Sequence, residues 1–230
     1  DNPTFGNYGR FTEASTLGDG FFAWGAQLEE GSTATNYQRV GSFLDVSEEG
    51  KARRGRIWYN GTSHFMETGT ITPGTDKVQV FAGVRKLSDA ARGVLAETST
   101  GIASNNGAVN VQAPGVPGVD EYRLNTKGTS QTAAASSGRP DTAVIAGVAD
   151  ISGDNAILRV NGTQVNQSTA DQGTGNYLAY PLYFGARAGT SLFYNGYEDT
   201  SIVRFGPNLD DSVIGKVESY VASKTPEETI

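Results

Sequence analysis

Three of the Asn-Gly pairs in this 230-residue chain are set among stretches of alternating apolar and polar residues, and they constrain its fold more than any other feature. Asn and Gly both tolerate positive φ, so the pair suits the type I′ turn that closes a two-residue β-hairpin. Asn161-Gly162 separates the alternating residues 157–160 and 163–165. The pair recurs at Asn60-Gly61 and Asn195-Gly196. We therefore expect an antiparallel β protein with a hairpin at each pair.

Strands are predicted wherever apolar and polar residues alternate over several positions. They fall at residues 56–66 (as a hairpin), 77–84, 92–97, 121–125 and 142–149. Residues 99–118 are rich in Gly, Asn, Ala and Pro and are predicted to form loops, and residues 126–140 a Ser/Ala/Thr/Gly-rich connector. The 30 glycines suit a chain with many tight turns.

One helix is predicted near the C-terminal end, beginning at Asp210-Asp211, where the helix dipole favours carboxylates. Its apolar residues recur at helical spacing and are expected to pack on the edge of a sandwich: Val213, Val217, Tyr220 and Val221.

Charge and composition exclude several classes of protein. The net charge is −7 and no run of basic residues is longer than the one at residues 51–54, which argues against a nucleic-acid partner. The chain has no cysteine and a single histidine, His64, so disulfides and a zinc site are excluded. No run of 18 apolar residues exists, and no membrane insertion is expected. Because it begins at Asp1-Asn2-Pro3 without Met, we expect the chain to be a C-terminal fragment.

The first residues resemble part of another domain. The string FFAWGAQLEEGSTATNYQRV (residues 21–40) is similar to a segment of many phage tail-fibre and minor structural proteins, where it closes a jelly roll like that of carbohydrate-binding modules. This resemblance implies that residues 1–40 are the C-terminal strands of a preceding β module and a linker. Residues 41–230 would then form a second domain.

The order of motifs from YNGTSHFMET through LRVNGTQV and PLYFGARAG to FYNGYEDTSIVRFG and the final helix resembles a known superfamily. It is similar to the concanavalin A-like lectin/glucanase superfamily in its laminin-G-like form, as found in phage and prophage virion proteins. The resemblance covers about residues 56–224. It implies an all-β fold, with two antiparallel sheets packed as a jelly roll and ligands on a concave face or at rim loops.

Sugar binding needs flat aromatic rings beside amide or charged side chains. Such residues gather within some twenty positions, and we take them as the candidate ligand-binding set: Asn176, Tyr177, Tyr180, Arg187, Tyr194 and Tyr197. Alternation must send some of these rings into the core, so packing is the competing interpretation for each. Trp58 is expected in the core and His64 exposed on a strand.

Catalytic and metal sites find weaker support. The related glucanases carry Glu-x-Asp-x-x-Glu on one strand; this chain lacks it, and its acidic pairs are adjacent residues that face opposite sides of a strand. We therefore expect no catalytic residues and no enzymatic activity. Calcium is the one metal with candidate ligands, the oxygens of residues 150–155, although an Asp/Gly turn bonded to its own backbone explains the same residues. No other cofactor is expected.

The sequence thus predicts a non-enzymatic protein of the phage virion surface, in a tail fibre or similar appendage, whose lectin-like domain binds host-surface glycans. The other expected partners are further virion proteins and copies of the chain itself, in a homo-oligomer such as a trimer. Two alternatives stay open. One is a purely structural module with no sugar ligand, and the other is a polysaccharide-degrading glycoside hydrolase.

Overall fold

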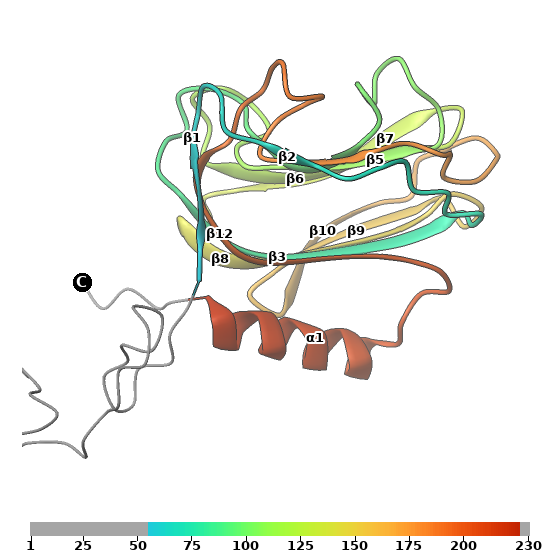
Figure 1. Cartoon of the computed structure of the whole chain (residues 1–230). Helices are drawn as coiled ribbons and strands as arrows, with labels where there is room; N and C mark the ends of the chain where they lie inside the picture. The colour runs from blue at the N-terminus through green and yellow to red at the C-terminus, as the bar shows by residue number, and fades with distance from the viewer. Residues whose placement is uncertain (1–54, 226–230) are drawn as a thin grey trace, which may run out of the picture. The chain divides into compact units, whose positions relative to one another are not determined.

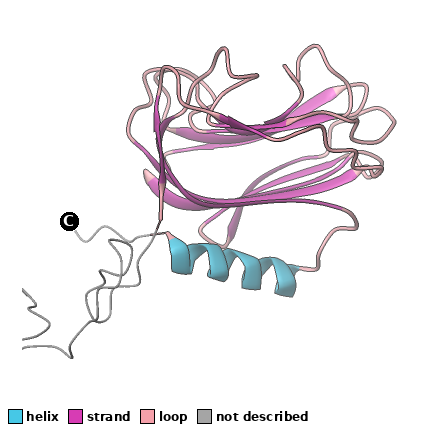
Figure 2. Ribbon diagram, in the orientation of Figure 1, coloured by secondary structure: helices cyan, strands magenta, loops and turns pink. Residues whose placement is uncertain are grey.

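The computed structural model describes residues 55–225 of the chain, which belong to a unit beginning at Arg54. Two six-stranded sheets pack face to face, and all pairings between their strands are antiparallel (Figures 1 and 2). The first, here called the helix-side sheet, has the order β1 (Ile57–Asn60), β12 (Asn195–Phe205), β3 (Lys77–Lys86), β8 (Thr142–Asp150), β9 (Asn155–Val160) and β10 (Thr163–Ser168). The second, the loop-side sheet, has the order β2 (Met66–Glu67), β11 (Leu182–Phe184), β4 (Val94–Thr98), β5 (Ala108–Gln112), β6 (Glu121–Lys127) and β7 (Gln131–Ser137).

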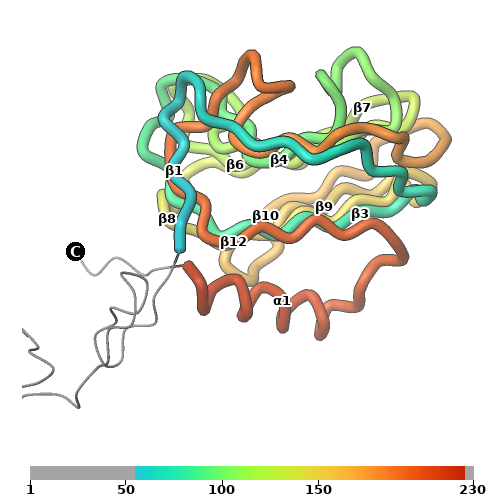
Figure 3. Tube along the Cα trace, in the orientation of Figure 1, coloured from blue at the N-terminus to red at the C-terminus, as the bar shows by residue number. Residues whose placement is uncertain are grey.

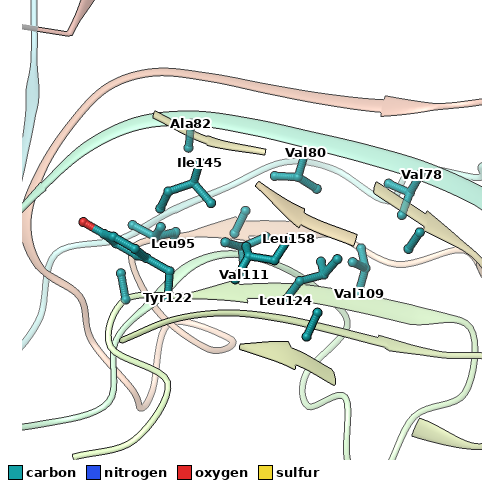
Figure 4. Close-up of a cluster of buried hydrophobic side chains, with 14 of the residues drawn as sticks. Val78, Val80, Ala82, Leu95, Val109, Val111, Tyr122, Leu124, Ile145 and Leu158 are labelled. Atoms are coloured by element: carbon teal, nitrogen blue, oxygen red, sulfur yellow. The ribbon is translucent and has the colours of Figure 1, made fainter. Parts of the chain in front are cut away.

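The core lies between the two sheets, where alternate residues of each strand point inward (Figure 4). From the helix-side sheet come Val78, Val80, Ala82, Ile145 and Leu158. The loop-side sheet supplies Leu95, Val109, Val111, Tyr122 and Leu124. Burial of these apolar surfaces is the main source of stability for a chain without disulfides. The predicted antiparallel sandwich is confirmed.

One of the three Asn-Gly hairpins is confirmed. Asn161 and Gly162 have φ of 49° and 77° and join β9 to β10, as a type I′ turn requires. The Asn161 side chain also accepts a hydrogen bond from the Val144 N–H at 2.8 Å, which fixes the turn against β8.

The other two pairs do not form hairpins, which corrects the prediction. Asn60-Gly61 ends β1 and starts the crossing to β2 in the other sheet, so residues 56–66 are not a hairpin. Asn195-Gly196 lies within β12, where a Cβ on Gly196 would stand 2.3 Å from the Arg85 carbonyl oxygen. Glycine is needed there for close approach of the backbone, not for a turn.

Two strands lie where the sequence predicted irregular segments. β5 lies within residues 99–118 and β7 within residues 126–140. β7 reads QTAAASS, in which small residues occupy both faces and hide the alternation. The predicted strands at 77–84, 92–97, 121–125 and 142–149 correspond to β3, β4, β6 and β8.

The predicted helix is confirmed as α1 (Asp211–Lys224), with Asp210 as its N-cap accepting from the Val213 N–H at 2.9 Å. It lies across the outer face of the helix-side sheet and not at the sandwich edge (Figure 3). Ile214 and Val221 are buried there against Phe81. Tyr220, predicted on the packing face, is 55% exposed, because the buried stripe runs through Ile214, Glu218 and Val221. No helix among the described residues is long and apolar enough to cross a membrane.

A carboxyl group is buried at an irregularity of β12. Glu198 is 3% exposed and points toward the core beside Val84, where the pairing of β12 with β3 shifts register. Burial, reinforced by the charge of Asp199, raises the pKa of Glu198 from 4.5 to about 8. The native state therefore binds this proton more tightly than the unfolded chain does.

This shift predicts that stability falls as pH rises. The contribution of the protonated Glu198 is complete below pH 4.5 and is lost progressively as pH approaches 8. Glu198→Gln removes the titration, so the variant is expected to exceed the parent in stability at pH 9 by a few kcal/mol, at about 1.4 kcal/mol for each unit of pKa difference. Urea unfolding at pH 5 and pH 9 measures this, with exposed Glu67→Gln as the control. Equal stabilities of E198Q and parent at pH 9 would contradict a proton-binding Glu198.

Candidate functional site

The six residues predicted to bind a ligand are not brought together in one place. Tyr177 and Tyr194 belong to the core, 2% and 0% exposed. The Tyr177 hydroxyl lies 2.7 Å from Thr126 Oγ1, and the Tyr194 hydroxyl donates to the Tyr197 carbonyl at 3.3 Å. Their rings are enclosed by packing and offer no face to a ligand, which corrects the prediction for these two.

The remaining candidates divide among three places. Asn176 and Tyr180 lie against the turn at Asn106 and Gly107, and the Tyr180 hydroxyl donates to the Asn106 carbonyl at 3.1 Å. Arg187 lies over the loop-side sheet, and Tyr197 lies on the outer face of the other sheet. A role for these four in ligand binding stays a prediction.

The outer face of the loop-side sheet carries a row of polar side chains. Tyr183, Glu97, Asn110 and Asn125 are consecutive register partners across β11, β4, β5 and β6. All four are buried. Asn125 Nδ2 donates to Asn110 Oδ1 at 2.7 Å.

Loops cover this polar face (Figure 1). Arg187 Nε and Nη2 reach the two oxygens of Glu97 at 2.9 and 3.1 Å, and the Ile102 N–H donates to the same carboxylate at 3.0 Å. Lys127 Nζ donates to the Ala103 carbonyl at 2.7 Å. The polar groups of this face are thus largely occupied by the protein's own loops.

Three carboxylates meet at one end of the sandwich, those of Asp89, Asp120 and Asp141, with oxygens within 4.8 Å of one another. Lys86, whose side chain is fully buried, contacts all three: Asp89 at 2.9 Å, Asp141 at 3.8 Å and Asp120 through a short hydrogen bond. Burial acts to lower the pKa of Lys86, but its hydrogen bonds to Asp120 and Asp89 outweigh burial and raise that pKa. An internal ammonium group therefore occupies the centre of this carboxylate cluster.

The residues considered as calcium ligands are also bonded to other groups of the protein. Asp150 Oδ1 accepts from Lys77 Nζ at 2.9 Å and from the Gly153 N–H at 2.9 Å. Lys77 Nζ also lies 3.1 Å from Asp76 Oδ2. An Asp/Gly turn bonded to its own backbone accounts for the contact between Asp150 and Gly153, and ion pairs with Lys77 account for the others.

The outer face of the helix-side sheet holds an exposed aromatic group. Trp58, Tyr197 and Arg85 are register partners on the neighbouring strands β1, β12 and β3, so their side chains share one face. Trp58 is 51% exposed, which corrects its predicted place in the core. The Arg56 guanidinium lies 4.5 Å from the centre of the Tyr197 ring and its Nε donates to Asp199 at 3.1 Å.

The loop after β1 holds this group in place. Asn60 Oδ1 accepts hydrogen bonds from the backbone N–H groups of Thr62, Ser63 and His64 at 2.9–3.1 Å. His64 is exposed, and its ring meets that of Trp58 edge to face at 5.2 Å, with Nδ1 3.1 Å from the Trp58 carbonyl oxygen. The Trp58 ring is therefore carried by β1 and contacted on one side by a loop with defined hydrogen bonds. We call Trp58, Tyr197 and Arg85 the aromatic row.

A pocket of about 560 Å³ lies between α1 and the strands β8 and β9. Its charged residues are Arg159 and the buried Glu218, joined at 2.8 and 3.1 Å. Thr142, on the sheet side of this pocket, is the register partner of Arg85. Sequence reasoning missed this pocket, although the small residues Gly215, Ser219 and Ala222 at helical spacing are a signal for it.

No protein-family model matches the chain, and no curated protein matches it significantly. Solved structures do match. The CBM40 module of the Ruminococcus gnavus IT-sialidase, bound to α2,3-sialyllactose, is 12% identical with a TM-score of 0.50, over 66% of this chain and 98% of the module. A SAP-like pentraxin from Limulus polyphemus is 12% identical with a TM-score of 0.53, over 71% of this chain and 81% of its own.

The binding domain of botulinum neurotoxin serotype G is 11% identical with a TM-score of 0.55, over 73% of this chain and 43% of that structure. Identities this low show a shared fold alone. The fold is a lectin-like jelly-roll β-sandwich, as the sequence predicted.

Proposed function

We propose that residues 41–230 form a non-enzymatic glycan-binding module. The observation that carries this proposal is the half-exposed ring of Trp58, set beside Tyr197 and Arg85 on the outer face of the helix-side sheet. Sugar rings stack on aromatic faces while arginine and amide groups bond their hydroxyls. The likeness in fold to a module bound to sialyllactose is consistent with this function.

We propose further that the chain belongs to a phage tail fibre or similar virion appendage and that its ligand is a host-surface glycan. The resemblance of residues 21–40 and 56–224 to phage virion proteins supports this setting. Association into a homo-oligomer, as a trimer, is part of the same proposal. Light scattering on the purified chain measures the oligomer, and gold-labelled antibody against the chain should mark the appendages of virions in electron micrographs.

Replacing Trp58 with alanine is expected to weaken glycan binding about tenfold or more, because a central tryptophan contributes roughly 2 kcal/mol to an interface. The test is binding to an array of bacterial surface polysaccharides. Trp58→Ala should leave the melting temperature nearly unchanged, since the ring is half exposed. Tyr220→Ala removes an aromatic ring of similar exposure on the helix and is the matched control.

A structural module without a sugar ligand is the second candidate, and the loop-covered polar face of the loop-side sheet favours it. Contacts such as Arg187–Glu97 fill this face with the protein's own side chains and loops. An array on which the chain binds no polysaccharide would support this second function against the first.

A further inference from the structure

The aromatic row continues across the helix-side sheet into the pocket. Trp58, Tyr197, Arg85 and Thr142 are successive register partners on β1, β12, β3 and β8. Side chains of directly opposed residues lie on the same face, and neighbouring strands are about 4.8 Å apart, so the four positions span about 14 Å. Thr142 also lines the pocket. The exposed ring and the pocket are therefore two ends of one line of side chains.

The pocket has the size and opening of a ligand site. Its volume of about 560 Å³ lies in the range of small-molecule pockets. The helix wall is made of Gly215, Ser219 and Ala222, whose small side chains leave the space open. Ser219 and Ala222 are themselves exposed, so the pocket opens to solvent along the helix.

The residues that line the pocket include one positive and one negative side chain. Glu218 is 5% exposed, and both of its oxygens contact the Arg159 guanidinium. Arg159 Nη2 also donates to the Gly162 carbonyl at 2.8 Å. A second carboxylate entering this space would be repelled by Glu218, while Nε and Nη2 of Arg159 are already engaged. The pocket therefore disfavours an anionic group.

The other polar groups of the pocket suit hydroxyl groups. The Ser219 hydroxyl donates to the Gly215 carbonyl at 2.8 Å and that of Thr225 to the Val221 carbonyl at 3.0 Å. With its own proton engaged, each oxygen still has a lone pair to accept a hydrogen bond. A ligand rich in O–H donors and without charge matches this lining.

Building on the proposed function, we propose that the aromatic row and the pocket form one extended site for a linear oligosaccharide. The neutral terminal sugar of the oligosaccharide enters the pocket under α1, and an internal sugar stacks on Trp58. The site thus recognises a chain end. Oligosaccharides that end in a carboxylated sugar bind less well.

The test uses an array of bacterial surface polysaccharides together with their fragments of increasing length, with neutral or carboxylated ends. For a polysaccharide that binds, affinity should rise with fragment length and then level off, and carboxylated ends should weaken binding about tenfold. Ser219→Trp fills the pocket and should weaken binding of the long neutral fragments about tenfold. Ser223→Trp, exposed on the same helix and outside the pocket, is the matched control.

The outcomes separate the two proposals. If Ser219→Trp binds like the parent while Trp58→Ala fails to bind, the extended site is wrong and the proposed function stands. Tighter binding of carboxylated ends would also overturn the extended site. If no array component binds, both proposals fall. Ala222→Trp fills the same pocket from the next turn and replaces Ser219→Trp if that variant does not fold, as judged by circular dichroism.

Discussion

Replacing Lys86 with methionine is expected to lower the free energy of unfolding by about 1–3 kcal/mol at pH 7, because the three carboxylates lose their shared ammonium group while water screens part of their charge, their side chains being 29–67% exposed. The Lys86 side chain is fully buried among Asp89, Asp120 and Asp141. Without the ammonium group, three carboxylates with oxygens within 4.8 Å of one another repel. Urea unfolding of the variant and the parent measures the loss.

A matched control is Lys77→Met. Lys77 also bridges two carboxylates, those of Asp76 and Asp150, but its side chain is 28% exposed, so its loss should cost about 1 kcal/mol or less. Acidification neutralises the carboxylates and should reduce the difference in unfolding free energy between Lys86→Met and the parent. Equal losses for the two lysine variants would show that burial does not govern the Lys86 cluster.

Replacing Arg187 with methionine is expected to cost about 3–5 kcal/mol of unfolding free energy, since the carboxylate of Glu97 is fully buried and would lose its counter-charge. Because Arg187 was predicted to bind a ligand, the variant also tests that role. If Arg187 serves to neutralise Glu97, the substitution lowers the free energy of unfolding. In the ligand interpretation, Arg187→Met lowers glycan binding while the melting temperature stays near that of the parent.

The double variant Glu97→Gln with Arg187→Met resolves the origin of that loss. Glutamine keeps an acceptor for the Ile102 N–H and carries no charge, so most of the stability should return. Thermal unfolding of the parent, both single variants and the double variant completes the cycle. A double variant as unstable as Arg187→Met would show that lost packing, rather than the unpaired charge, causes the effect.

The sheet architecture could be predicted from local patterns, and the exceptions have physical causes. Asn161-Gly162 formed the expected turn because strands of the same sheet flank it on both sides. Asn60-Gly61 shares the string Asn-Gly-Thr with it, but the strands on its two sides belong to different sheets, and strand pairing far away in the sequence decides this. β7 was not predicted from the sequence because its Ala and Ser residues are compatible with either face of a sheet and show no alternation of apolar and polar residues.

The candidate site was harder to predict. Clustering in sequence placed Tyr177 and Tyr194 beside Tyr197, yet only the structure distinguishes core rings from surface rings. Three apolar residues follow one another in the stretch Ile57-Trp58-Tyr59. Their order therefore does not indicate which side chains face the core. Tyr59 faces inward and Trp58 outward on an edge strand. The pocket depends on how α1 crosses the sheet, which no local pattern contains.

The pairing of β1 with β12, the first and last strands of the part of the chain that the structure describes, has a consequence for synthesis. Arg56, just before β1, contacts Asp199 in β12, 143 positions later. On the ribosome, at about 5–20 residues per second, β1 therefore waits on the order of ten seconds for its partner. Until then the nascent chain exposes the unpaired edges of β1 and β3, both of which pair with β12. Closure of this sheet is thus expected to follow release of nearly the whole domain, and chaperones that shield strand edges should raise its yield.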